Sequence, residues 1–132
     1  MSTFNKIQLN KIGDLRGNLV AIESKNSIPF EFKRAYYIYS LDEKTPRGFH
    51  AHRELKQFAV CVSGQCKIKM DNGKVKETVL LDNPAEGLVI GPFEWHEMFD
   101  FSHDCVLLVL ASEHYDEKDY IRSYDEFLEL IK

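Results

Sequence analysis

The stretch RGFHAHRELKQFAVCVSG, residues 47–64, places a His-x-His pair directly before a run of strand-forming residues. If residues 47–52 form a β-strand, His50 and His52 point to the same face, with their Cα atoms about 7 Å apart. Two imidazoles on one face suit a metal ion or a two-point proton relay, and a solvent-facing pair is the structural alternative. The fold around the pair decides between these possibilities.

Short strand-like segments lie on both sides of this stretch. Apolar alternation, or enrichment in β-branched and aromatic residues, marks them at 6–9, 19–23, 34–39, 67–70, 74–81, 87–92 and 105–112. The triplet Asp71-Asn72-Gly73 separates two of these segments and is a strong hairpin signal. Residues 67–70 alternate lysine with apolar side chains, which predicts one buried and one solvated face.

Only the C-terminus has a helical pattern. Ser123 and Glu126 form a capping box. The residues that share one helical face are Tyr124, Phe127, Leu128 and Ile131. Many short strands followed by one short helix predict an all-β fold, a jelly-roll β-barrel with a cavity between its sheets.

Length and composition indicate one globular domain covering residues 1–132. The net charge of −4 and the scattered lysines argue against nucleic acid as a partner. The longest apolar run, residues 106–111, is too short to span a bilayer, and the N-terminus carries no cleavage signal. Cys61, Cys66 and Cys105 lack the spacing of a disulfide framework or zinc knuckle, so we expect reduced core thiols. These features predict a cytoplasmic protein that does not enter a membrane.

The spacing after the histidine pair bears on the metal question. It resembles the first motif of the cupin superfamily: H-x-H, four residues, an acidic residue, six more and a glycine. Here Gln57 stands in the acidic position, and His96 is the candidate third histidine. Glutamine is neutral and a poorer ligand than glutamate for a divalent cation, so we expect no metal. Imidazole, with an ordinary pKa near neutrality, then serves as an acid and base, and Gln57 orients a ring nitrogen or a ligand hydroxyl.

Longer motifs point to one family. They are DLRG at 14–17, RAYYIY at 34–39, RGFHAH at 47–52, GPFEWHEMFDFS at 91–102, CVLLVLAS at 105–112 and YDEKDYIRSYDEF at 115–127. Together they span nearly the whole chain, which resembles the nucleotide-sugar 3,4-ketoisomerases, the family of dTDP-4-keto-6-deoxyglucose 3,4-ketoisomerase.

The resemblance implies a metal-independent cupin β-barrel without a cofactor, and a homodimer with exchanged N-terminal strands. It implies an isomerase that moves the keto group of dTDP-4-keto-6-deoxy-D-glucose from C4 to C3 through an enediol or enediolate. His50 is by resemblance the base that shuttles the carbon-bound proton, and His52 exchanges protons with the sugar oxygens. The opposite assignment of the two histidines is also chemically sound. The product serves 3-amino-sugar biosynthesis for lipopolysaccharide or S-layer glycans.

Other site residues are carried over from the same resemblance. Tyr36 is expected beside the sugar, and Arg16 is expected to stabilise the developing enolate by its charge. Arg34 and Arg47 are candidates for the diphosphate, because the guanidinium matches phosphate geometry. Trp95 is expected near the thymine. The structural alternatives are surface or interior ion pairs for the arginines and a core position for the tryptophan.

Two further expectations concern the product and the rival functions. Arg16 together with His96 is expected to accompany the galacto configuration at C4. The enzymatic rivals are a dTDP-sugar 3,5-epimerase, whose catalytic histidine pairs with an aspartate, and a metal-dependent cupin dioxygenase. A non-catalytic cupin that binds sugar nucleotides is the third alternative.

Overall fold

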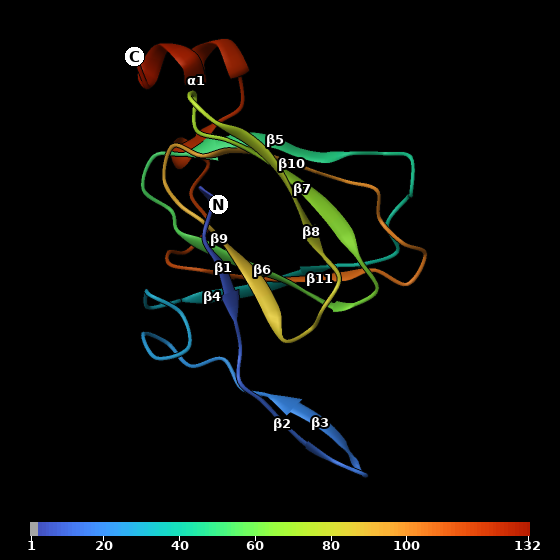
Figure 1. The fold of residues 1–132 in the computed structure, drawn as a ribbon. Coiled ribbons are helices and arrows are strands. Elements are labelled where there is room, and N and C mark those ends of the chain that lie inside the picture. The colour runs from blue at the N-terminus through green and yellow to red at the C-terminus, as the bar shows by residue number, and fades with distance from the viewer. Residues whose placement is uncertain (1–2) are drawn as a thin grey trace.

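The computed structural model describes residues 3–132, and it consists mainly of two facing antiparallel sheets (Figure 1). The first sheet has the order β1 (Lys6–Gln8), β9 (Glu86–Ile90), β6 (Gln57–Ser63), β11 (Val106–Ala111) and β4 (Arg34–Ile38). The second has the order β12 (Tyr120–Ile121), β5 (Arg47–His52), β10 (Trp95–Phe99), β7 (Cys66–Asp71) and β8 (Lys76–Leu81). This arrangement confirms the predicted all-β barrel of the cupin type.

The hairpin predicted at Asp71-Asn72-Gly73 joins β7 to β8. The Asn72 side-chain oxygen accepts hydrogen bonds from the backbone N–H groups of Lys74 and Val75, at 2.9 and 2.8 Å. The strands then pair in register from Asp71 opposite Lys76. Asparagine and glycine tolerate the backbone angles of such tight turns, which explains why the local signal was reliable.

The main core fills the space between the sheets. Ile68 and Met70 are fully buried, whereas the alternating Lys67 and Lys69 are only partly covered, as the period of two predicted. Burial of such side chains contributes roughly 1.5–3 kcal/mol each to folding. The core therefore holds the two sheets face to face.

The three cysteines lie together in this core as free, buried thiols, as expected. The Cys61 sulfur is 3.4 Å from that of Cys66 and 3.8 Å from that of Cys105. Burial raises the pKa of the Cys105 thiol to about 12, and the hydrogen bond with Cys66 and burial raise the pKa of Cys61. All three thiols are therefore buried packing groups of the core.

Gly64 makes the turn between β6 and β7, and we expect Gly64→Ala to destabilise the protein by at least about 2 kcal/mol. Its φ of +67° is unfavourable for a residue with a Cβ. An added Cβ would also lie 2.9 Å from the Cys105 Cα, which is backbone and cannot rotate away. Urea unfolding measures the change, and a loss below 1 kcal/mol would contradict this account of the turn.

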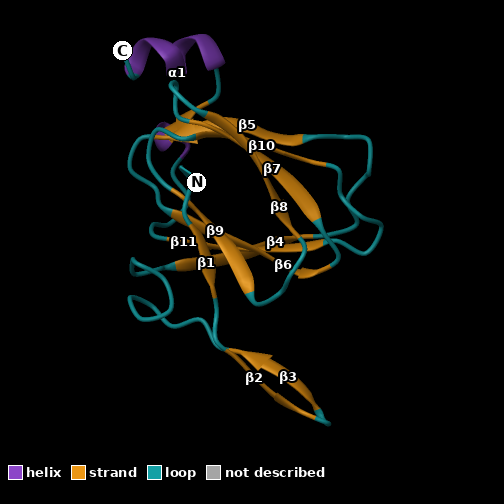
Figure 2. Ribbon diagram, viewed as in Figure 1, coloured by secondary structure: helices purple, strands orange, loops and turns teal. Residues whose placement is uncertain are grey.

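The C-terminal helix α1 (Tyr124–Leu130) covers the outer face of the second sheet (Figure 2). The Ser123 hydroxyl caps it by accepting a hydrogen bond from Glu126 N, as the capping box predicted. Phe127 is fully buried, and Tyr124 and Ile131 pack against the same cluster. Leu128 was predicted on this face but is 38% exposed, because the helix buries a narrower stripe.

The N-terminal hairpin of β2 (Lys11–Asp14) and β3 (Gly17–Val20) projects away from the barrel, on the side opposite α1 (Figure 1). A strand was predicted over 19–23, but β3 already ends at Val20. Between the two strands only Leu15 and Arg16 turn, where the Asp14 carboxylate accepts a hydrogen bond from Arg16 N at 2.8 Å. The residues on either side of this turn pair as β2 and β3, from Asp14 opposite Gly17.

Membrane insertion through a helix was not expected. Within residues 3–132, no helix is long and apolar enough to cross a bilayer.

Candidate active site

Three histidine rings form one wall inside the barrel. His50 and His52 lie on β5, and His96 lies opposite His50 on the neighbouring strand β10. The ring centre of His50 is 5.0 Å from that of His52 and 4.5 Å from that of His96. The strand alternation predicted for the His-x-His pair is therefore correct, because Ala51 between the two packs on the opposite face in the cluster under α1.

The backbone at the start of β5 brings the strands unusually close. Gly48 has a φ of +95°, and a Cβ there would lie 3.0 Å from the His96 carbonyl oxygen. The pairing register of β10 with β5 also shifts between His96 and Glu97. Such bulges bend a strand and redirect its side chains, and they are frequent next to active sites. Here the irregularity accompanies the close approach of His50 and His96.

Two of the rings have their tautomer defined by carbonyl groups. His50 Nδ1 lies 3.1 Å from the Gly48 carbonyl oxygen, and His96 Nδ1 lies 3.0 Å from the Glu94 carbonyl oxygen. A carbonyl can only accept a hydrogen bond, so each Nδ1 carries the proton. In the neutral ring, Nε2 then has a free lone pair. His50 is consequently built to act as a base through Nε2.

All three histidines are held in the neutral form at pH 7. Burial lowers the pKa of His52 to about 3 and that of His96 to about 3. Burial also lowers the pKa of His50, and the hydrogen bond to the Gly48 carbonyl opposes this only in part. A neutral imidazole can accept a proton from substrate at once, as a general base must.

This electrostatic setting predicts the pH dependence of turnover. Because the pKa of His50 is lowered from 6.5, its base form persists at neutral pH and is lost only at a pH below 6.5. We expect kcat/KM to be flat from pH 7 down to 6.5 and to decline at more acid pH. Steady-state rates across pH 5 to 8 measure this, and an acid limb centred above pH 7 would contradict a lowered pKa at the base.

The opposite sheet contributes a tyrosine and the glutamine of the histidine motif. Gln57, on β6, is 2% exposed, and its Nε2 donates a hydrogen bond of 2.8 Å to the Tyr36 hydroxyl on β4. Burial raises the pKa of Tyr36, so the phenol stays protonated. The glutamine was predicted to orient a ring nitrogen or a ligand hydroxyl, and in this structure its amide N–H group holds the Tyr36 hydroxyl.

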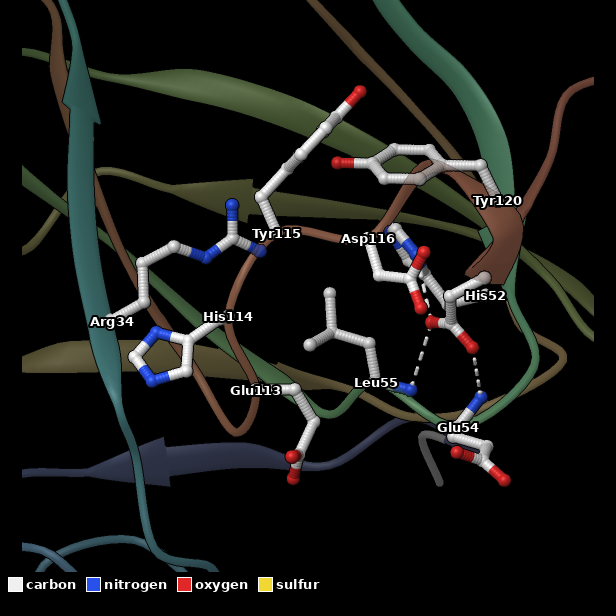
Figure 3. Close-up of a pocket in the computed structure, with 10 residues that line it drawn as sticks. Arg34, His52, Glu54, Leu55, Glu113, His114, Tyr115, Asp116 and Tyr120 are labelled. Carbon is white, nitrogen blue, oxygen red and sulfur yellow. Dashed lines mark hydrogen bonds and ion pairs between the residues drawn. The ribbon is translucent and has the colours of Figure 1, made fainter.

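Two cavities open on this interior. The larger, about 520 Å³, is lined by His50, Tyr36, Arg34, Arg47 and Arg122 among others. The smaller, about 350 Å³, is lined by His52 together with residues of the segment 113–120. Figure 3 shows Arg34 and Tyr120 on opposite sides of the smaller cavity. Both residues line both cavities, so the two spaces adjoin along them.

Positive charge gathers in the larger cavity. Arg34 has a buried Nε without a hydrogen-bond partner among residues 3–132, and its guanidinium lies 5.3 Å from the Tyr36 ring centre. Arg122, which the sequence reading missed, lies 4.3 Å over the Tyr120 ring and forms a bidentate pair with Glu117. These guanidinium groups suit an anionic ligand such as a diphosphate.

Two predicted site residues lie elsewhere. Arg16 is at the tip of the projecting hairpin, where it pairs with Asp14 and its side chain is 90% exposed. Trp95 packs against Tyr124 and Phe127 beneath α1, and its indole Nε1 donates to Glu97 at 2.9 Å. Trp95 precedes His96 on β10, so strand alternation directs it to the outer face. Within one chain, neither residue joins the histidine wall.

The same wall contains the nitrogen atoms that could hold a metal. One ring nitrogen from each of His50, His52 and His96 lies within 4.8 Å of the others. In the part of the chain that the structure describes, no carboxylate joins this group, because Gln57 occupies the acidic position of the cupin motif. The donor set is neutral and less suited to a hard divalent cation than one with a carboxylate.

Comparison with known proteins identifies the family. The family described as "FdtA: WxcM-like, C-terminal" matches residues 2–132. The chain belongs to this FdtA-like family.

Characterised relatives of this FdtA-like protein are similar over nearly their full lengths. It is 54% identical over 125 residues to the TDP-4-oxo-6-deoxy-alpha-D-glucose-3,4-oxoisomerase of Aneurinibacillus thermoaerophilus, covering 95% of this chain and 90% of the relative. The QdtA sugar 3,4-ketoisomerase of Thermoanaerobacterium thermosaccharolyticum, solved with TDP, is 45% identical with a TM-score of 0.95, covering 97% and 93% of the chains. The WlaRB TDP-quinovose 3,4-ketoisomerase of Campylobacter jejuni is 46% identical with a TM-score of 0.92, covering 98% and 99%. The predicted relationship is confirmed.

An aspartate that the sequence did not connect with the histidines lies beside His52 in this FdtA-like protein. Asp119 lies directly before β12, and its Oδ2 is 3.4 Å from His52 Nδ1. It is 67 positions from that histidine along the chain, so no local spacing rule connects them. The only signal in the sequence was that Asp119 belongs to the motif at 115–127. A motif of this kind does not show which residues the segment contacts.

Proposed function

We propose that this protein is a 3,4-ketoisomerase of dTDP-4-keto-6-deoxy-D-glucose, an intramolecular oxidoreductase that moves the keto group from C4 to C3. The observation that carries the proposal is the tautomer of His50. Its Nδ1 is engaged by the Gly48 carbonyl, so Nε2 is the free base in a cavity that is also lined by two tyrosines and three arginines. The oxoisomerase and ketoisomerase relatives supply the substrate class.

The chemistry needs only proton transfers. The C4 ketone acidifies the C3 proton, and His50 Nε2 removes it to give an enediolate with its charge on the C4 oxygen. The proton of the C3 hydroxyl then passes to the C4 oxygen, and return of the carbon proton from His50 to C4 leaves the ketone at C3. One base on one face of the sugar can make both carbon transfers, and His52 exchanges the protons of the two oxygens. The guanidinium of Arg34, whose Nε is buried, stabilises the enediolate charge.

The nucleotide is proposed to occupy the arginine-lined cavity. Arg34, Arg47 and Arg122 provide the positive charge for a diphosphate, and Tyr36, which lines the same cavity as His50, is proposed to lie beside the sugar. The QdtA relative was solved in complex with TDP. Trp95 has no place in this proposal, because it packs beneath α1.

The active unit is proposed to be a homodimer with exchanged N-terminal strands. Ile12, Leu15 and Leu19 of the projecting hairpin are 62%, 107% and 58% exposed, which is unusual for large apolar side chains on neighbouring positions. A second copy of the chain would cover them. The hairpin tip could then bring Arg16 to the enolate in the partner's site, which it cannot do within its own chain.

The product is proposed to have the galacto configuration at C4, because the chain combines an arginine at position 16 with a histidine at position 96. The ring of that histidine lies against His50. NMR of the purified product distinguishes the two C4 configurations through the coupling of H4. An equatorial C4 hydroxyl would overturn this part of the proposal. The 3-keto product is suited to a 3-aminotransferase, in a route to lipopolysaccharide or S-layer glycans.

The reaction is proposed to need neither metal nor cofactor, and to run in the cytoplasm. The neutral Gln57 in the carboxylate position and the three free core thiols support these points. Turnover should survive exhaustive treatment with a chelator. Loss of activity that returns on addition of a divalent metal would favour the metal-dependent reading.

The 3,5-epimerase is the second candidate, and the Asp119–His52 pair is the observation that favours it, since those cupins pair a histidine with an aspartate. Incubation with dTDP-4-keto-6-deoxy-D-glucose followed by NMR separates the functions. A 3-keto sugar is expected. Inversion at C3 and C5 would indicate an epimerase, and unchanged substrate with measurable binding would indicate a non-catalytic binder.

A further inference from the structure

We propose that Asp119 is a positioning residue for this reaction, which holds the His52 proton on Nδ1 and leaves Nε2 to exchange protons with the sugar oxygens. The effect on the reaction rests on the proposed function, whereas the contact between Asp119 and His52 does not depend on which substrate is bound. His52 Nδ1 lies 3.4 Å from Asp119 Oδ2, and the histidine side chain is 1% exposed.

The carboxylate is itself held rigidly. Glu54 N donates to Oδ1 at 2.9 Å and Leu55 N donates to Oδ2 at 3.1 Å, which are the bonds marked at Glu54 and Leu55 in Figure 3. The Asp119 carbonyl also accepts a hydrogen bond from Arg53 N at 3.0 Å. The loop after β5 is thereby clamped to the residue before β12, and this clamp places the carboxylate against the ring.

His52 needs such a partner more than the other two histidines. Carbonyl groups define the tautomers of His50 and His96, but both ring nitrogens of His52 are buried without a hydrogen bond among residues 3–132. Unpaired buried polar atoms are rare and costly. Asp119 can only accept, so a proton shared between the two belongs on Nδ1. The separation of 3.4 Å is long for this bond, and catalytic hydrogen bonds commonly shorten when substrate binds.

The ring is neutral, so its tautomer determines what it can do. Burial lowers the pKa of His52 to about 3, and the neighbouring His50, Arg34 and Arg122 act in the same direction. With the proton on Nδ1, Nε2 can accept a proton from one sugar hydroxyl and return it to the other oxygen. With the proton on Nε2, the ring can only donate at first, and the exchange begins in the wrong direction.

Asp119→Asn tests this because an amide cannot reproduce the carboxylate. Its single oxygen is drawn to the backbone N–H groups of Glu54 and Leu55, which leaves the NH2 group toward His52 Nδ1. An NH2 group donates, so it favours the tautomer with the proton on Nε2. Asp119→Glu keeps an acceptor and should restore part of the activity. Asp42→Asn is the matched control, because that exposed carboxylate also accepts from backbone, at Lys44 N, without contacting a histidine.

The first readout is independent of turnover. Long-range proton–nitrogen NMR of the 15N-histidine-labelled wild-type protein should show His52 protonated on Nδ1, and Asp119→Asn should move the proton to Nε2. The proposal is overturned if wild-type His52 carries its proton on Nε2. This measurement stands even if the substrate assignment fails, so the two failures are distinguishable.

The second readout separates positioning from a general loss of structure. We expect Asp119→Asn to lower kcat about 10- to 100-fold with little change in KM. Exchange of the C3 proton with heavy water, which His50 catalyses, should fall less than net keto transfer. If both fall by the same factor, or if Asp119→Asn behaves like Asp42→Asn, the proposal is wrong.

Discussion

Replacement of His50 by asparagine is expected to lower turnover by about a thousandfold or more while the barrel stays folded. The proposed base makes both carbon proton transfers through Nε2, and asparagine has no basic nitrogen at that point. Its amide can still donate to the Gly48 carbonyl, so the local strand geometry should persist. Rates of keto transfer measured by NMR, together with thermal unfolding, test the expectation.

A matched control is available for this variant. His103 lies in the exposed loop between β10 and β11, outside both cavities, so His103→Asn should turn over like the wild type. A His50→Asn protein that retains more than about a tenth of wild-type turnover would show that another group abstracts the C3 proton. His52 would then be the first alternative, since its ring centre lies 5.0 Å away.

The second large effect concerns the N-terminal hairpin. We expect the double variant Ile12→Glu, Leu19→Glu to convert a dimer to a monomer and to lose most turnover. These two residues face each other across β2 and β3 and are 62% and 58% exposed in one chain. Two carboxylates would prevent a partner from covering this surface, and the proposed delivery of Arg16 would then fail. Light scattering and keto-transfer rates measure the two consequences.

Lys11→Glu is the control for the hairpin variant. It changes charge on the same exposed strand without removing apolar surface, so both mass and turnover should be retained. A wild-type protein that is already a monomer in solution would contradict the dimer. A monomeric double variant with full turnover would instead show that Arg16 is not needed for the reaction.

Local signals in the sequence predicted most of the barrel. The Asp71-Asn72-Gly73 turn, the alternation at Ile68 and Met70, and the cap at Ser123 each depend on neighbouring residues alone. The two-residue strand β12 and the short helical turn Glu117–Asp119 before it were not predicted. Such short elements carry no periodicity, and pairing with β5 is what forms β12.

The site was predictable where residues share a strand. His50 and His52 alternate with Ala51, so their common face follows from strand geometry. The contact of His52 with Asp119 and the position of Arg122 depend on how the chain returns after β11, which no spacing rule describes. Trp95 was placed near the ligand because of its motif, whereas alternation with His96 directs it under α1.

The most direct test of the central claim is the reaction in heavy water. Wild-type protein is incubated with dTDP-4-keto-6-deoxy-D-glucose and followed by NMR. The account predicts a ketone at C3 with deuterium incorporated at C4 of the product and at C3 of the remaining substrate, and none at C5. Deuterium at C5, or a sugar that remains a 4-ketone, would contradict a single histidine base acting through an enediol.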